Sequence, residues 1–205
     1  MAVLPEDRRA LAVAMGAGGE AAALRVFPFI DNTLDAEGAV AGSNATVKEY
    51  GVGPLKQTVI TLSGRTITMT DEAGVVAYGG TKVYDFPAGN ILVLGATANL
   101  TVVESGTINA DFDGDFSLGT VTASNNASLS STEQNLIPST ATPQAVASAT
   151  TAKGINIAAI APLDGTTTPI DVYLNFIIDD ADQNGGGTFT VSGPITLTWI
   201  NLGDI

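Results

Sequence analysis

The residues best suited to bind a metal ion are acidic and fall in two short stretches. In IIDDADQNGGGTFTV, residues 177–191, the side chains of Asp180, Asp182 and Asn184, followed by a glycine, match the opening of a calcium-binding loop. A complete EF-hand loop would have a bidentate Glu at its twelfth position, where this chain has Val191, and helices on both sides instead of strand-like sequences. We therefore interpret this stretch as the tip of a β-hairpin, with calcium as the alternative.

The second acidic stretch, ADFDGDF, has carboxylates at every other position: Asp111, Asp113 and Asp115. If the stretch is a strand, all three side chains lie on one face, because successive residues point to opposite faces. Three neighbouring carboxylates repel one another unless water, a cation or a partner's basic side chain neutralises them. Asp-Gly sequences are common at tight turns. We favour a turn here, with a metal site as the alternative.

The chain has no Cys and no His, which removes most of the chemistry that catalytic sites use. It therefore lacks a thiol nucleophile, a Ser-His-Asp triad, the usual zinc ligands and an imidazole to shuttle protons. A carboxylate-based glycosidase would need two facing acids and a cleft lined by aromatic rings, and the chain has only one Trp and four Tyr. We expect a protein that is not an enzyme, and we assign no catalytic residue and no cofactor.

Charged residues make up only 14 % of the chain, compared with about 25 % in an average protein. The net charge of −13 is unevenly spread. Residues 1–82 carry seven of the eight basic groups, whereas residues 83–205 carry twelve acids and only Lys153. This distribution excludes nucleic acid as a partner of the C-terminal part. It also indicates that one side of the protein is docked against a neighbouring molecule while the other side faces solvent.

Neither a membrane span nor a secretion signal is predicted. No run approaches the roughly 18 apolar residues that a transmembrane helix needs. Near the N-terminus, Glu6 and Asp7 stand where a signal peptide requires basic residues. We expect a protein that is made and used without Sec export and without a membrane partner.

The chain divides into two regions of different composition. Residues 1–45 form an Ala/Gly-rich arm, in which Pro5 followed by two acids predicts the start of a short helix. Because this arm has little to bury on its own, we interpret it as a docking segment, with packing on its own domain as the alternative. Residues 46–205 have the composition of a β domain.

Within the β domain, apolar residues alternate with Thr, as is typical of strands. QTVITLS and RTITMT are predicted to pair through a turn at Ser63-Gly64, VVAYGG and TKVYDF through Gly79-Gly80, and NILVLGA and NLTVVES near residues 96–98. DFSLGTVTA, INIAAIA, DVYLNFII, TFTV and ITLTWINL add further strands. Many short antiparallel strands, each with one apolar face, predict an all-β fold: a jelly-roll-like antiparallel β-sandwich.

Two finer predictions concern the C-terminal half. Residues 124–153 are rich in Ser, Thr, Asn and Ala, and we expect a long loop with one helical turn that begins at the capping pair Ser130 and Glu133. In the last strands, strict alternation separates a core face from an opposite face. The predicted core face consists of Val172, Leu174, Phe176, Ile178, Ile195, Leu197 and Trp199, and the opposite face of Tyr173, Asn175, Ile177, Thr196 and Thr198.

Three segments carry a resemblance to a known family: YGGTKVYDFPAGNILVLGATANLTV, DFDGDFSLGTVTASNN with IPSTATP, and the closing ITLTWINLGDI. In their sequence and in their order along the chain, over about residues 75–205, they resemble head-decoration (cement) proteins of tailed bacteriophages. The resemblance implies a β-rich, jelly-roll-like protein of the virion that is assembled in the host cytoplasm. It also implies a homotrimer on the capsid exterior that binds the phage major capsid protein and fastens neighbouring capsomers.

Two other function classes remain open from the sequence. A tail-fibre or other host-recognition module would use the acidic loops, with or without calcium, to bind a receptor or glycan. A carboxylate-based glycosidase would use acids such as Asp111, Asp113 or Asp180. The number of copies per particle separates decoration from a tail module, because decoration requires many copies.

Overall fold

The computed structural model describes residues 44–51, 53–72, 75–105, 108, 114–142, 150–156, 162–179 and 187–204. The predicted all-β class is confirmed, and within these ranges no helix is long and apolar enough to cross a membrane. The predicted domain boundary after residue 45 falls at the beginning of the first strand; residues 1–43 of the arm lie outside the described residues. The elements are β1 (Ala45–Tyr50), β2 (Leu55–Thr68), β3 (Thr70–Glu72), β4 (Val76–Asp85), β5 (Gly89–Ser105), β6 (Gly114–Gly119), the 3₁₀-helix η1 (Ser131–Glu133), β7 (Ile137–Thr142), β8 (Thr150–Asn156), β9 (Leu163–Gly165), β10 (Asp171–Asp179) and β11 (Thr188–Asn201).

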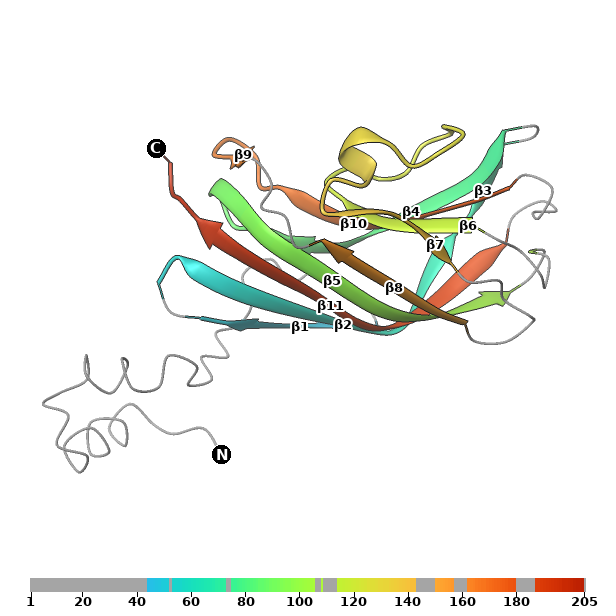
Figure 1. The fold of residues 1–205 in the computed structure, drawn as a ribbon, viewed down its shortest axis with the longest axis horizontal. Helices are drawn as coiled ribbons and strands as arrows, with labels where there is room; N and C mark the ends of the chain where they lie inside the picture. The colour runs from blue at the N-terminus through green and yellow to red at the C-terminus, as the bar shows by residue number, and fades with distance from the viewer. Residues whose placement is uncertain are drawn as a thin grey trace, which may run out of the picture.

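The strands form two antiparallel sheets that face each other (Figure 1). Sheet A has the order β1-β2-β11-β5-β8, with β9 also paired to β5, and sheet B has the order β3-β4-β10-β6-β7. Eight strands pair in a nested way: β2 with β11, β4 with β10, β5 with β8 and β6 with β7. A double-stranded ribbon wound into two sheets in this order is a jelly roll, as the sequence predicted.

The core lies between the two sheets and contains the predicted inward-facing residues. Phe86 makes edge-to-face contacts with Tyr84 and Trp199, at ring-centroid distances of 5.3 Å in both cases. The Trp199 indole N–H donates to Thr58 Oγ1 at 2.9 Å, so this buried polar atom is satisfied. The other predicted core residues of β10 and β11 are also buried: Val172, Leu174, Phe176, Ile178, Ile195 and Leu197.

The three predicted hairpins within residues 57–105 are wrong, because each predicted pair of strands is one continuous strand: β2, β4 and β5. In β2 the buried residues change from even to odd numbers, from Ile60 and Leu62 to Ile67. β2 has three steps between Leu62 and Arg65, whereas the paired residues of β11 are two steps apart. Gly64, with φ of +71°, lies in this β-bulge. A bulge therefore produces the change of phase that suggested a turn.

Gly79 and Gly80 have a different role from the predicted turn. A Cβ on Gly79 would lie 2.5 Å from the Thr68 carbonyl oxygen, and one on Gly80 would lie 2.5 Å from Asn175 Oδ1. These glycines allow β4 to approach β2 of sheet A closely at Gly79 and β10 of sheet B closely at Gly80. TFTV and ITLTWINL are likewise one strand, β11, and not two.

Residues 120–136, which we call the covering segment, connect β6 to β7 and lie over the outer face of sheet B (Figure 1). The predicted helical turn is confirmed as η1, and Glu133 Oε2 accepts from the Ser130 backbone N–H at 2.9 Å. The rest of the predicted long loop is partly wrong, because residues 137–142 and 150–153 belong to β7 and β8. Their Ser- and Thr-rich sequence concealed these strands.

The covering segment is attached to sheet B through Asn175, which is fully buried. Its amide nitrogen donates to the backbone oxygens of Val121 (2.9 Å) and Glu133 (2.8 Å), and its amide oxygen accepts from the Ala123 N–H (2.8 Å). Ile177 packs beside it against Ala123 and Leu129. Asn175 and Ile177 therefore lie opposite the core, as predicted, but they contact protein and not solvent.

Candidate functional site

The predicted metal ligands are mostly outside the described residues: Asp111, Asp113, Asp180, Asp182 and Asn184 all fall in the gaps. Asp115 is described. It lies on the outer face of β6, and its Oδ2 accepts from Ser139 Oγ at 2.6 Å. Among the residues with described positions, no three acidic, His or Cys side chains are close enough together to hold a metal ion. The calcium alternative thus stays untested by the structure.

The hairpin interpretation of residues 177–191 is wrong. β10 precedes residues 180–186 and pairs with β4 and β6 in sheet B, whereas β11 follows and pairs with β2 and β5 in sheet A. Two strands in different sheets cannot form a hairpin. The nested pairing of the jelly roll explains the difference, because it pairs β10 with β4 and β11 with β2, which lie in opposite sheets.

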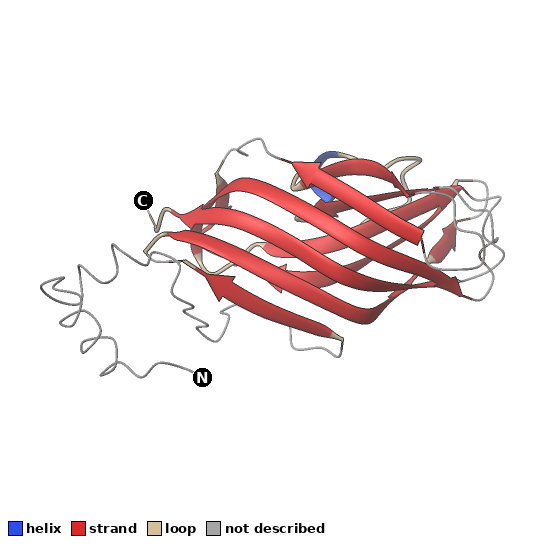
Figure 2. Ribbon diagram, turned by 60° about the horizontal axis from the view of Figure 1, so that its bottom comes forward, coloured by secondary structure: helices blue, strands red, loops and turns tan. Residues whose placement is uncertain are grey.

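The outer face of sheet A is almost free of charge, and it forms our candidate site. It runs across β1, β2, β11 and β5, whose strands lie side by side in Figure 2, and its side chains alternate with the core residues. Most of them are Thr or Ser, and Lys48 at the edge is the one charged side chain among those described on this face. The outward-facing residues are Thr46, Lys48, Tyr50, Leu55, Gln57, Val59, Thr61, Ser63, Thr66, Thr68, Leu92, Thr97, Asn99, Thr101, Val103, Thr188, Thr190, Ser192, Pro194, Thr196, Thr198 and Ile200.

Asp164 lies beyond these four strands, on β9 beside Asn90 of β5, and several other described carboxylates lie away from this face. Asp85, Asp115 and Asp171 are on the outer side of sheet B, and Glu49 sits on the inward side of β1 in an ion pair with Lys56 at 3.0 Å. The nearly uncharged surface and the surface that carries Asp85, Asp115 and Asp171 are therefore two faces of the sandwich. They do not correspond to the two halves of the chain, because β2 and β11 both contribute to the uncharged face.

Such a face is unusual for a surface that stays in water. Soluble domains usually carry charges on about 25–35 % of their surface residues, whereas the centres of protein interfaces are depleted of charge. Two apolar side chains on this face are also well exposed, Leu55 at 48 % and Val103 at 37 %. The arrangement therefore fits a surface that packs against another protein.

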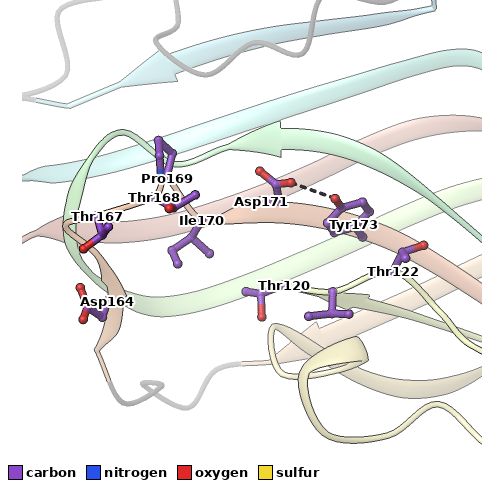
Figure 3. A pocket seen from close by; sticks show the side chains of 10 residues that line it. Thr120, Thr122, Asp164, Thr167, Thr168, Pro169, Ile170, Asp171 and Tyr173 are labelled. Carbon is purple, nitrogen blue, oxygen red and sulfur yellow. Dashed lines mark hydrogen bonds between the residues drawn. The ribbon is translucent and has the colours of Figure 1, made fainter.

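On the opposite side, an ionic cluster links β4 and β10 at the end of sheet B. Asp85 and Asp171 are direct cross-strand neighbours. Lys82 Nζ lies 2.6 Å from Asp85 Oδ1 and 2.8 Å from Asp171 Oδ1. Figure 3 shows the hydrogen bond that Tyr173 Oη donates to Asp171 Oδ2 at 2.8 Å. Two like charges placed opposite each other on adjacent strands are unfavourable. Lys82 pairs with both carboxyls and offsets part of this repulsion.

The two carboxyls of the cluster have pKa values shifted in opposite directions. A hydrogen bond from Asp85, together with those from Lys82 and Tyr173, lowers the pKa of Asp171 to about 2. Burial and the same shared hydrogen bond raise the pKa of Asp85. Burial opposes the charge of Lys82, but hydrogen bonds to Asp171 and Asp85 outweigh it and raise the pKa of Lys82. Because the two carboxyls share a hydrogen bond, there is no room between them for the sugar that a glycosidase pair encloses.

We expect Asp171→Asn to lower stability near neutral pH but to have little effect in strong acid. The pKa of Asp171 falls from 3.8 to about 2 on folding, so its contribution is present above pH 3.8 and is lost as the pH falls through about 2. The pKa of Asp85 is raised on folding, so its contribution to stability has the opposite pH dependence. Because the Asp171 side chain is a third exposed, we expect a loss of only about 1 kcal/mol at pH 6.

Urea unfolding at pH 6 and at pH 2 measures this effect of Asp171. The matched control is Asp204→Asn at the exposed C-terminal end, which should change stability little at either pH. A deficit of Asp171→Asn that is equally large at both pH values would contradict the ionic role.

Comparison with known proteins adds only distant structural likenesses. No protein-family model matches the chain, and no curated protein does. An arabinose-bound GH51 α-L-arabinofuranosidase is similar with a TM-score of 0.38 and 13 % identity over 82 % of this chain, which spans 25 % of that enzyme. A putative sugar-binding protein of Bacteroides thetaiotaomicron (TM-score 0.24, 12 % identity, 84 % and 86 % of the two chains) and the enzymatically active domain of bacteriophage CBA120 tailspike protein 4 (0.21, 12 %, 81 % and 20 %) are weaker likenesses. At these scores none of them carries a functional argument.

Sequence reasoning missed both the nearly uncharged outer face of sheet A and the ionic cluster, although part of the pattern that marks the first was visible. The alternation of Thr with apolar residues marks outward positions on each strand, but it does not say that β2, β11 and β5 are neighbours. The ionic cluster had no local signal, because Asp85 and Asp171 are far apart in the sequence and meet only through the pairing of β4 with β10.

Proposed function

We propose that this protein is a structural virion protein that binds the outer surface of an icosahedral phage head and stabilises the lattice of the major capsid protein. The observation that carries the proposal is the uncharged outer face of sheet A in a chain with a net charge of −13. The resemblance of residues 75–205 to head-decoration proteins indicates which partner this face would meet.

The docking mode follows from the distribution of charge. The outer face of sheet A packs on the capsid, where its Thr and Ser hydroxyls pair with polar groups and Leu55 and Val103 bury apolar surface. An interface of standard size uses about 20–30 residues from each partner, which such a face can supply. The side that carries Asp85, Asp115 and Asp171 then faces solvent.

Stabilisation of the head arises from multivalency. In a homotrimer that touches several capsid subunits, each contact holds the others in place, so modest individual contacts give strong attachment. The shell cannot rupture without breaking many such contacts together. The segment of residues 1–45 is proposed to add to the attachment.

Copy number in purified virions tests this function. Quantitative mass spectrometry of intact particles, calibrated against the major capsid protein, should give a number of copies comparable to the number of capsid subunits. A tail or host-recognition module would be present in only a few copies per particle, and this result would overturn the proposal. Heads that lack the protein should also rupture at a lower temperature than decorated heads.

A further inference from the structure

A cleft opens at the end of sheet B that carries the ionic cluster, and β9 of sheet A contributes Asp164 to its rim. One wall is formed by residues 120–122 of the covering segment and the other by residues 167–170 before β10, with Asp171 and Tyr173 between them (Figure 3). Its volume of 560 Å³ lies within the range of roughly 300–1,000 Å³ typical of small-molecule sites.

The lining of the cleft combines hydroxyl groups with apolar surface. The hydroxyls can both donate and accept hydrogen bonds, and the aromatic ring of Tyr173 and the Pro169 and Ile170 side chains supply apolar contact. A ligand with many hydroxyls on a ring that has apolar C–H faces matches this combination. The hydroxyl-bearing residues are Thr120, Thr122, Thr167, Thr168 and Tyr173.

The polar groups at the base of the cleft are already held in position. Asp171 is bound by Lys82 through one oxygen and by Tyr173 through the other, so neither side chain has to be ordered when a ligand arrives. The Tyr173 hydroxyl points its hydrogen at Asp171, which leaves its oxygen as a hydrogen-bond acceptor. Binding to a pre-organised site avoids part of the entropy cost of ordering.

The charge of the cleft selects against anions. Asp164 and Asp171 both line it, and the ammonium of Lys82 is already held by two carboxylates. A phosphate or a carboxylate-bearing ligand would meet negative charge without a free cation to offset it.

We propose that this cleft binds a neutral saccharide unit. The inference goes beyond the proposed role in head decoration and does not depend on it, because the free protein should bind the ligand. None of the described residues that line the cleft belongs to the outer face of sheet A, so a copy docked through that face would leave the cleft accessible. An array of copies would then present many weak saccharide sites together.

The test is an NMR titration of the full-length, ¹⁵N-labelled protein with the methyl glycosides of glucose, galactose, mannose and N-acetylglucosamine. At least one should shift the backbone amides of residues 120–122 and 167–168 in a saturable way, with a Kd of about 1–10 mM, as expected for a single weakly held ring. N-acetylneuraminic acid, an anion, serves as the charged probe and should bind more weakly.

Two variants and a matched control separate binding from stability. Tyr173→Phe should weaken the binding about two- to tenfold by removing one hydroxyl, and Thr168→Trp should abolish it by filling the cleft. Tyr78→Phe removes a hydroxyl from the same sheet outside the cleft and should bind like the wild type. The proposal is overturned if no neutral glycoside shifts these amides, if the charged probe binds more tightly than all of them, or if Thr168→Trp folds and still binds normally.

Discussion

Thr196→Glu is expected to abolish attachment to phage heads while the protein stays folded. Thr196 lies at the centre of the uncharged face, between Val59 of β2 and Thr97 of β5. An unpaired carboxylate buried in an interface costs several kcal/mol. Because each 1.4 kcal/mol is about a tenfold change in affinity, we expect at least about a 100-fold loss of affinity per copy.

Three comparisons make this result specific to the outer face of sheet A. Thr132→Glu, on the covering segment, adds the same charge to the opposite side and should leave head occupancy unchanged. Thr196→Val keeps the shape without the charge and should still bind. Urea unfolding and analytical ultracentrifugation of the free protein show whether the fold or the oligomer has changed; we expect a stability change within about 1 kcal/mol. If Thr196→Glu decorates heads at wild-type occupancy, this face is not the docking surface.

Asn175→Ala is expected to be the most destabilising single change on the outer side of sheet B. The substitution leaves the N–H of Ala123 and the carbonyl oxygen of Val121 without their side-chain partner inside a buried region, whereas the Glu133 carbonyl oxygen keeps its hydrogen bond from Ser117 Oγ. Each unsatisfied buried polar group costs about 1–3 kcal/mol, and partial relaxation reduces the sum. We expect a loss of about 3 kcal/mol, or a decrease in Tm of about 6–12 °C for a chain of this size.

Hydrogen exchange locates the effect of Asn175→Ala. The amide of Ala123, which donates to the Asn175 side chain, should exchange much faster in the variant, whereas the amides of β11 in sheet A should change less. The matched control is Asn99→Ala, at an exposed position of β5, which should alter stability by no more than about 0.5 kcal/mol. Equal stabilities of the two variants would show that Asn175 does not hold the covering segment in place.

The errors of the sequence prediction have identifiable physical causes. The bulge at Gly64 changes which residues face the core, so one long strand carries two phases of alternation and suggests two strands. Gly79 and Gly80 suggested a turn, although they stand where other groups approach the backbone of β4. At residues 177–191 two apolar stretches around Asp, Asn and Gly suggested a hairpin, but the flanking strands belong to different sheets.

The sequence by itself determined the class of the fold and much of its interior. Alternation of period two marks the inward side of each strand, which is why the core positions of β10 and β11, including Phe176 and Trp199, were predicted correctly. The absence of Cys and His likewise limits the chemistry without any knowledge of the structure. Both properties belong to single residues or to neighbours along the chain.

Only the tertiary structure decided which strands are neighbours, and both proposed sites depend on this. β2 lies beside β11, and Asp85 lies opposite Asp171, because the ribbon of the jelly roll pairs strands from opposite ends of the domain. Alternation states which face of a strand is buried but carries no information about its lateral partner. That choice is made by the packing of two complete sheets around one core, so the uncharged face and the ionic cluster appear only when the chain is folded.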